Sequence, residues 1–142
     1  MAEPSTERTL IEVGVKWMDM SNNMQNNAIE HSIMEYKKGS SRLHETLPEV
    51  AGAYFNFTEA CFEEGALDKK QKQLTALGIS ITKQDEYCIL YHAKGAAEAG
   101  ATEAEIMETV AISAALGGGA AFAQGVTLAL DAYNHYQGPA AH

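Results

Sequence analysis

One cysteine and one histidine, four residues apart, are the side chains of this sequence best placed to do chemistry. Cys88 precedes His92 in the stretch QDEYCILYH, and Asp85 lies three residues before the cysteine. Residues three and four apart project from one side of an α-helix, so the three side chains are expected to lie together. A cysteine reacts as its thiolate, and an adjacent imidazole can accept its proton or stabilise the anion. Asp85 acts in the opposite sense, because its negative charge disfavours a thiolate and favours a charged His92.

The same residues are also compatible with a structural role. A free cysteine on a helix is usually a small buried hydrophobic residue, and Cys61, the second cysteine, lies on an apolar stripe and is expected in the core. Asp85, near the start of its helix, is better explained as a capping acid than as a catalyst.

A metal site is a lesser alternative. Asp85, Cys88 and His92 could supply three ligands, but the sequence lacks the second closely spaced cysteine or histidine pair that is typical of zinc sites. Further ligands could come only from distant histidines, namely His31, His44 and His135. We therefore expect no metal and no other cofactor.

Helices must position these residues, because the composition favours helix throughout the chain. Alanine, methionine, glutamate and leucine are plentiful, alternating apolar and polar runs are scarce, and there are only 3 prolines. Apolar residues spaced by three and four run from Leu10 to Ala28. The stretch KKGSSR at 37–42 is expected to interrupt this region. We predict an all-α, single-domain bundle of six to seven helices.

Capping pairs, prolines and glycines predict the helix boundaries in the rest of the chain. Pro48 suits a first helical turn, and Gly65 suits the position just past the end of that helix. Gly100 can end a later helix, and GGG at 117–119 is expected to break the last helical run. Three pairs of residues resemble helix-starting capping boxes, namely Asp68 with Gln71, Thr82 with Asp85, and Thr102 with Glu105.

The helices over residues 83–99 and 103–116 are joined by very few residues. We therefore expect them to pack antiparallel against each other.

Charge and the absence of targeting signals limit the possible partners and location. The net charge is −9, and no basic cluster exceeds DKKQK, so nucleic acid and anionic membrane are not expected partners. The first residues do not resemble a secretory signal, and no stretch approaches the ~18 uninterrupted apolar residues of a membrane span. With 2 cysteines a disulfide framework is excluded, and the expected location is the cytoplasm.

The string LDKKQKQLTALGISITKQDEYCILYHAKGAAEAGATEAEIMETVAISAALGGGAAFAQGVTLA, from about Leu67 to about Ala129, combines several motifs. It contains a predicted helix that begins after L-D-K and runs to I-S, followed by the motif YCIxxH. The turn AGATEAEI and the glycines at 117–119 come next. It resembles the carboxymuconolactone decarboxylase superfamily, specifically its AhpD-like alkylhydroperoxidase branch. The resemblance implies an AhpD-like helical bundle over residues 46–142, with residues 1–45 as a helical extension. It also implies a symmetric homo-oligomer, a trimer or a hexamer.

The resemblance implies a role for each candidate residue. Cys88 stands in the position that attacks peroxide, and His92 stands in the proton-relay position. The sequence departs from the branch at two places, with Asp85 where a resolving cysteine is expected and Gln73 where a glutamate is expected. A sulfenic acid on Cys88 would therefore need another thiol, from Cys61, a small molecule or a partner protein. Gln73 can form hydrogen bonds but cannot carry a proton, and Asp85 could replace the missing carboxylate.

Three functions follow as hypotheses. The first is a thiol-dependent peroxidase with Cys88 as nucleophile, His92 as relay, and Gln73 and Asp85 as orienting groups. The second is a non-redox decarboxylase-type enzyme acting on a small carboxylated substrate. Such an enzyme would need a cation, for which the candidates are Lys83, Lys94 and His92. The third is a binding or scaffold protein that has kept the fold and lost the chemistry.

Overall fold

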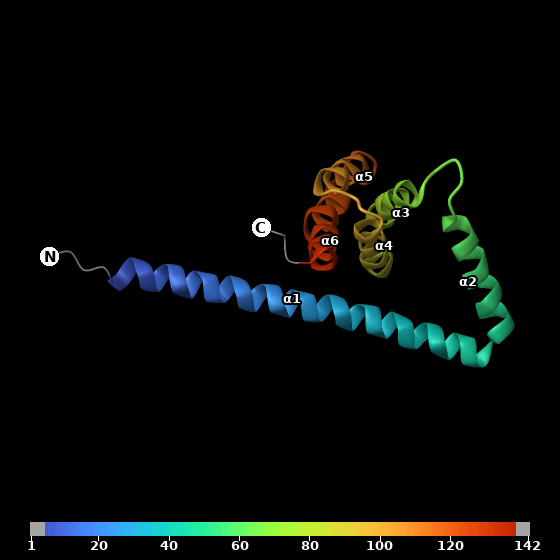
Figure 1. Ribbon diagram of the computed structural model, residues 1–142, viewed down its shortest axis with the longest axis horizontal. Coiled ribbons are helices and arrows are strands. Elements are labelled where there is room, and N and C mark those ends of the chain that lie inside the picture. Colours follow the sequence, from blue (N-terminus) through green and yellow to red (C-terminus); the bar gives the residue numbers. More distant parts are fainter. Residues whose placement is uncertain (1–4, 139–142) are drawn as a thin grey trace.

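One long helix, α1 (Ser5–Thr46), opens the part of the chain that the structure describes (Figure 1). The structure is a computed structural model that describes residues 5–138, with side chains from Leu10 onwards. Residues 5–138 contain helices and no strand, which confirms the predicted all-α class. The later elements are α2 (Pro48–Phe62), α3 (Lys69–Lys83), α4 (Glu86–Glu98), α5 (Glu103–Gln124), the π-helical η1 (Gly125–Ala129) and α6 (Leu130–Gln137).

Counted as continuous runs, the described residues form 5 helices, slightly fewer than the six to seven expected, because α5, η1 and α6 follow one another without a gap.

The expected break at 37–42 is absent, because α1 continues through it. Gly39 lies inside the helix with nothing within 4 Å of the position of a Cβ. A single exposed glycine costs a helix only about 1 kcal/mol, which does not end it. The helix ends instead before Pro48, as expected for a residue that precedes proline. Leu47 has φ −134° and ψ 68°, and Pro48 begins α2 as predicted.

Two of the three predicted capping boxes are confirmed, at the starts of α3 and α5. The third is wrong, because Thr82 lies inside α3 and its hydroxyl donates to the carbonyl of Gly78 at 2.9 Å. Gln84 then adopts a left-handed conformation with φ 57°, and Asp85 itself becomes the N-cap of α4. Gly65 was expected just past α2, but the helix ends at Phe62 and the glycine lies in the following loop.

The helix α3 is the centre of the bundle. The expectation that α4 and α5 pack against each other is wrong, because each packs against α3 instead. Gly100, with φ 83°, ends α4 as predicted, and the buried Ala101 then redirects the chain. The carbonyl of Ala101 accepts a hydrogen bond from the Tyr133 hydroxyl at 2.8 Å, which fixes this corner to α6. The largest fully buried side chains come from these three helices, namely Leu77, Ile81, Ile89, Leu90, Ile106 and Ser113.

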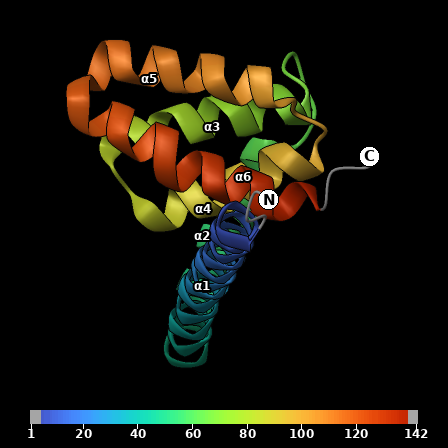
Figure 2. The same cartoon turned by 90° about the vertical axis from the view of Figure 1, so that its left-hand side faces the viewer.

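The run Glu103–Gln137 has the length and hydropathy of a membrane-spanning helix, although the sequence was expected to contain no such stretch. It is not a straight rod. Gly118 has φ 75° and ψ −159°, which confirms the break predicted at the glycine triplet. The chain folds back there (Figure 2), so that Gly125 lies against the side chain of Val110. A helix bent back on itself cannot cross a membrane as one span.

The helix α1 lies along one side of this bundle, against α4 and α6, and α5 lies on the far side (Figure 2). Ile29 and Ile33 are the residues of α1 that are buried in the core. Towards the N-terminus α1 continues beyond the edge of the bundle (Figure 1). The division of the chain into residues 1–45 and 46–142 stays a prediction.

Candidate functional site

The first turn of α4 holds Asp85 and Cys88 together. The carboxylate of Asp85 accepts a hydrogen bond from the backbone N–H of Cys88 at 3.2 Å and caps the helix. The capping role expected for Asp85 is therefore confirmed. The residue is the N-cap of α4 itself, whereas the capping pair with Thr82 would have placed it in the first helical turn. Its carboxylate is engaged with the cap and adjacent to the thiol at the same time.

The thiol of Cys88 is partly buried and is less acidic than a free cysteine. Burial raises the pKa of Cys88, and hydrogen bonding to Asp85 and its negative charge raise it further, while the charge of Lys83 acts against them. His92 is not among the groups that shift this pKa, so support of the thiolate by the imidazole stays a prediction. Within residues 5–138 no hydrogen bond joins the thiol to the imidazole. Asp85 disfavours the thiolate of Cys88, as expected from its negative charge.

His92 is held by Gln73, which reaches it from α3. The Oε1 atom of Gln73 lies 2.9 Å from Nδ1 of His92. An amide oxygen only accepts hydrogen bonds, so Nδ1 carries the hydrogen in this arrangement and Nε2 keeps a free lone pair. Burial lowers the pKa of His92, and the charge of Asp85 only partly opposes this. The imidazole is therefore neutral at pH 7 and able to accept a proton at Nε2.

Gly95 makes the contact between Gln73 and His92 possible. A Cβ at residue 95 would lie 2.8 Å from Nε2 of Gln73 and closer still to Oε1. Real Cβ atoms do not approach heavy atoms so closely, so any larger residue would displace the amide. This small residue therefore allows α3 to approach α4 closely.

Aromatic residues surround the site, one from α4 itself and two from other helices. Phe62 stacks on the imidazole of His92, with ring centroids 5.3 Å apart and an angle of 15°. Tyr91 meets the same imidazole edge-on at 5.4 Å. Tyr36 of α1 lies 6.4 Å from the ring of Tyr91.

Burial raises the pKa of Tyr36, and the neighbouring Cys88 contributes in the same direction. The helix α1, expected to be an extension, therefore covers the site. No spacing rule connects Tyr36 or Phe62 to Cys88, because they meet only through tertiary packing.

Cys61 is exposed, so its expected place in the core is wrong. The buried residue of α2 is Ala51, and the stripe that carries Cys61 points to solvent, with Phe57 67% exposed. Both cysteines are free thiols. Cys61 remains available as a second thiol.

The metal alternative finds no ligand set in the described residues, because no three His, Cys, Asp or Glu side chains gather there. His135 is paired with Glu30, with 2.7 Å between Nε2 and Oε1. Lys94 pairs with Glu98 and lies over the ring of Tyr136, so it points away from Cys88. Of the two lysines considered as the cation for a carboxylated substrate, Lys83 is therefore the one beside the cysteine.

Comparisons with known proteins relate this chain to one family. The sequence profile of the carboxymuconolactone decarboxylase family matches residues 48–131. The Paracoccus denitrificans protein described as uncharacterized protein 4 in cox locus is 38% identical over 89 residues, which cover 61% of this chain and 80% of that protein. An uncharacterized protein of Cupriavidus necator is 27% identical over 87 residues, covering 61% and 77%.

A solved structure has the same fold. The crystal structure of the apo form of a carboxymuconolactone decarboxylase family protein from Legionella pneumophila superimposes with a TM-score of 0.74 at 26% identity. The superposition covers 78% of this chain and 98% of that one. All four candidate residues, Gln73, Asp85, Cys88 and His92, lie inside the range of the family profile.

Proposed function

Because this chain belongs to the carboxymuconolactone decarboxylase family, we propose that it is an AhpD-like, one-cysteine thiol peroxidase whose nucleophile is Cys88. The observation that carries the proposal is the hydrogen bond between Gln73 and His92. It leaves a neutral imidazole with a free Nε2 one helical turn after the cysteine. A nucleophile, a base and a residue that orients the base are the three parts of an activated cysteine site.

The reaction begins with removal of the thiol proton. Since burial and Asp85 raise the pKa of Cys88, little thiolate exists at neutral pH and a base is required. Nε2 of His92 accepts the proton after a change of side-chain rotamer that brings sulfur and imidazole together. The sulfur then attacks one peroxide oxygen, the O–O bond breaks, and the imidazolium returns its proton to the leaving alkoxide. The products are an alcohol and a sulfenic acid on Cys88, so the sulfur loses the two electrons that the peroxide gains.

The cycle closes with two thiols from a donor. The first attacks the sulfenic sulfur and releases water, giving a mixed disulfide, and the second releases Cys88 as a thiol and leaves the donor oxidised. Asp85 replaces the resolving cysteine of the branch, so the donor must be a small thiol, a partner protein or Cys61. The cytoplasm, where such thiols stay reduced, suits this chemistry.

The surroundings of the site favour an organic hydroperoxide as substrate. Phe62 and Tyr91 line the imidazole, and Tyr36 adds a third ring from α1. Aromatic walls favour binding of an alkyl or aryl group over binding of hydrogen peroxide.

Consumption of cumene hydroperoxide in the presence of dithiothreitol tests the proposal. Cys88→Ser should reduce the rate to that of the buffer, whereas Cys61→Ser, which removes an exposed thiol, should leave most of it. Intact-protein mass spectrometry after peroxide treatment without donor should show oxygen added at Cys88. Equal rates in the wild type and Cys88→Ser would refute the peroxidase.

A binding protein without catalysis is the second candidate, and one observation favours it. The raised pKa of Cys88 is the opposite of what a reactive cysteine needs. In that case Cys88 should react with iodoacetamide no faster than a free cysteine at every pH, and peroxide should leave it unmodified.

A further inference from the structure

Tyr36 of α1 lies over the turn of α4 that carries Cys88. Its ring centroid is 6.2 Å from that of Tyr87 and 6.4 Å from that of Tyr91. These two tyrosines are about one helical turn apart, and Tyr87 directly precedes Cys88 in the sequence. The charge of Cys88 also helps to raise the pKa of Tyr36, so the phenol and the thiol are within electrostatic reach of each other.

The packing of α1 holds Tyr36 in this position. Ile29 and Ile33 are buried in the core, and Tyr36 follows them at spacings of four and three residues, on the same side of the helix. One turn before Tyr36, the hydroxyl of Ser32 donates a hydrogen bond to the carboxylate of Glu86 at 3.5 Å. This contact joins α1 to the first turn of α4. Tyr36 therefore faces α4 because of contacts on both sides of it along α1.

The hydroxyl of Tyr36 is free to donate a hydrogen bond. The buried Tyr133 donates its hydroxyl hydrogen to the carbonyl of Ala101, but Tyr36 donates to no protein acceptor in the described part of the chain. Burial raises the pKa of Tyr36, so the phenol keeps its hydrogen at neutral pH, and hydrogen bonding to Ser40 only partly opposes this. The side chain is still 42% exposed, so a substrate can reach it.

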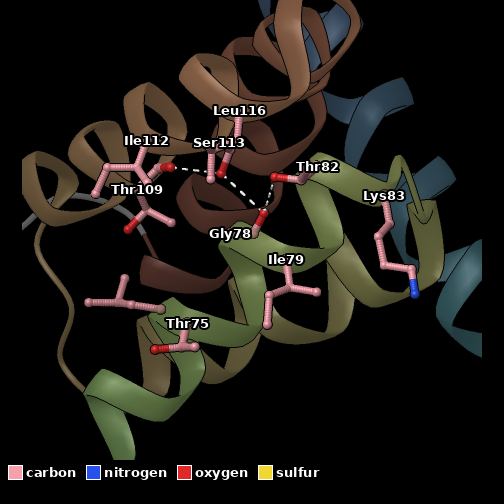
Figure 3. A pocket seen from close by; sticks show the side chains of 10 residues that line it. Thr75, Gly78, Ile79, Thr82, Lys83, Thr109, Ile112, Ser113 and Leu116 are labelled. Carbon is pink, nitrogen blue, oxygen red and sulfur yellow. Dashed lines mark hydrogen bonds between the residues drawn. The ribbon is translucent and has the colours of Figure 1, made fainter.

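The cavity between α3 and α5, about 500 Å³ in volume, does not include the site (Figure 3). Its walls are side chains of α3 and α5, and neither Cys88 nor His92 is among them. Gln73 of α3 lies against Nδ1 of His92, so α3 closes that side of the imidazole. A hydroperoxide therefore reaches Cys88 from the surface of α4 that is turned towards α1, where Tyr36 lies.

We propose that Tyr36 donates a hydrogen bond to the leaving oxygen of the hydroperoxide, which makes it a catalytic residue supplied by α1. This role rests on the proposed peroxidase function and adds to it a residue outside the range of the family profile, 48–131.

The chemistry of the leaving group gives the reason for such a donor. Sulfur attacks the terminal peroxide oxygen, the O–O bond breaks, and negative charge develops on the oxygen that carries the alkyl group. A hydrogen-bond donor aimed at that oxygen stabilises the transition state. Tyr36 keeps its own hydrogen, because the imidazolium of His92 is the stronger acid and supplies the proton that leaves with the alcohol.

Tyr36→Phe tests the proposal, because it removes the hydroxyl and keeps the ring in contact with Tyr87 and Tyr91. With dithiothreitol as donor, kcat/KM for cumene hydroperoxide should fall by about tenfold or more. The loss should be much smaller for peracetic acid, because its leaving group is a carboxylate that needs little stabilisation. Alkylation of Cys88 by iodoacetamide, which has no peroxide oxygen, should keep its wild-type rate.

Tyr54→Phe is the matched control, since it removes a phenol hydroxyl from an exposed ring of α2 that packs on Phe55, and it should leave both peroxide rates unchanged. Circular dichroism and Tm of Tyr36→Phe should match the wild type, which separates loss of the hydroxyl from loss of the fold. Equal losses with the two peroxides, or no loss with either, would overturn the role of Tyr36 and leave the peroxidase in place. A wild-type protein that consumes neither peroxide would overturn the peroxidase and this role with it.

Discussion

The side-chain oxygen of Gln73 lies 2.9 Å from Nδ1 of His92, so an uncharged amide orients this imidazole. The family resemblance implies a glutamate at position 73. A carboxylate would orient the ring equally well and would also stabilise its charged form. The amide provides orientation without charge, which agrees with the neutral imidazole that burial favours.

Gln73→Glu should therefore raise the pKa of His92, by about 1 unit or more. If His92 relays protons, the peroxidase rate at pH 7 should rise by about tenfold, because the imidazolium formed during attack gains a partner. Titration of the ring protons by NMR measures the pKa. Gln73→Met, which removes the acceptor without adding charge, is the control and should not raise it. An unchanged pKa in Gln73→Glu would show that the two side chains do not meet.

Gly95→Ala should break the hydrogen bond between Gln73 and His92 by displacing the Gln73 side chain. The added Cβ displaces the end of the Gln73 side chain, which is flexible, so we expect the loss of one hydrogen bond, about 1 kcal/mol, and no collapse of the core. This loss offsets the gain that alanine brings inside a helix, so the net change in stability should be near zero. The matched control is Gly52→Ala, at an open helical position of α2, where alanine should stabilise by about 0.5–1 kcal/mol. Urea unfolding measures both. Equal effects of the two substitutions would contradict the steric role of Gly95.

Local sequence rules predicted the helices well and the site only in part. Periodicity and caps locate α3, α4 and α5, because these signals lie within one helix. The family resemblance placed Gln73 and His92 in one site, but their hydrogen bond joins residues 19 positions apart and came only from the structure. Tyr36 and Phe62 could not be predicted, because only the path of α1 and α2 around the bundle brings them to the site. The exposure of Cys61 has the same origin, since its stripe is apolar but faces solvent in the described part of the chain.

Asp85→Asn should make Cys88 more reactive. Asparagine keeps the N-cap and removes the negative charge that helps to raise the pKa of Cys88. The rate of alkylation by iodoacetamide near pH 8 should increase several-fold, and its pH midpoint should move down. Asp68→Asn, at the N-cap of α3, changes charge and cap in the same way away from the thiol and should have no effect. An unchanged midpoint in Asp85→Asn would mean that burial alone raises the pKa of Cys88.

Acid should destabilise the fold through His92 before the carboxylates respond. Burial lowers the pKa of His92 in the folded protein below its value of 6.5 in the unfolded chain. Between these two pKa values the unfolded state binds more protons, so the stability present above pH 6.5 is lost as the pH falls. Glu30 and Glu105, whose pKa values are lowered from 4.5, contribute only at more acidic pH.

Wild-type protein should therefore lose a few degrees of Tm between pH 7.5 and pH 5.5. His92→Asn should remove most of this slope, whereas His44→Asn, at the exposed end of α1, should keep it. A slope that survives in His92→Asn would place the titrating group elsewhere and would argue against a buried, neutral imidazole beside Cys88.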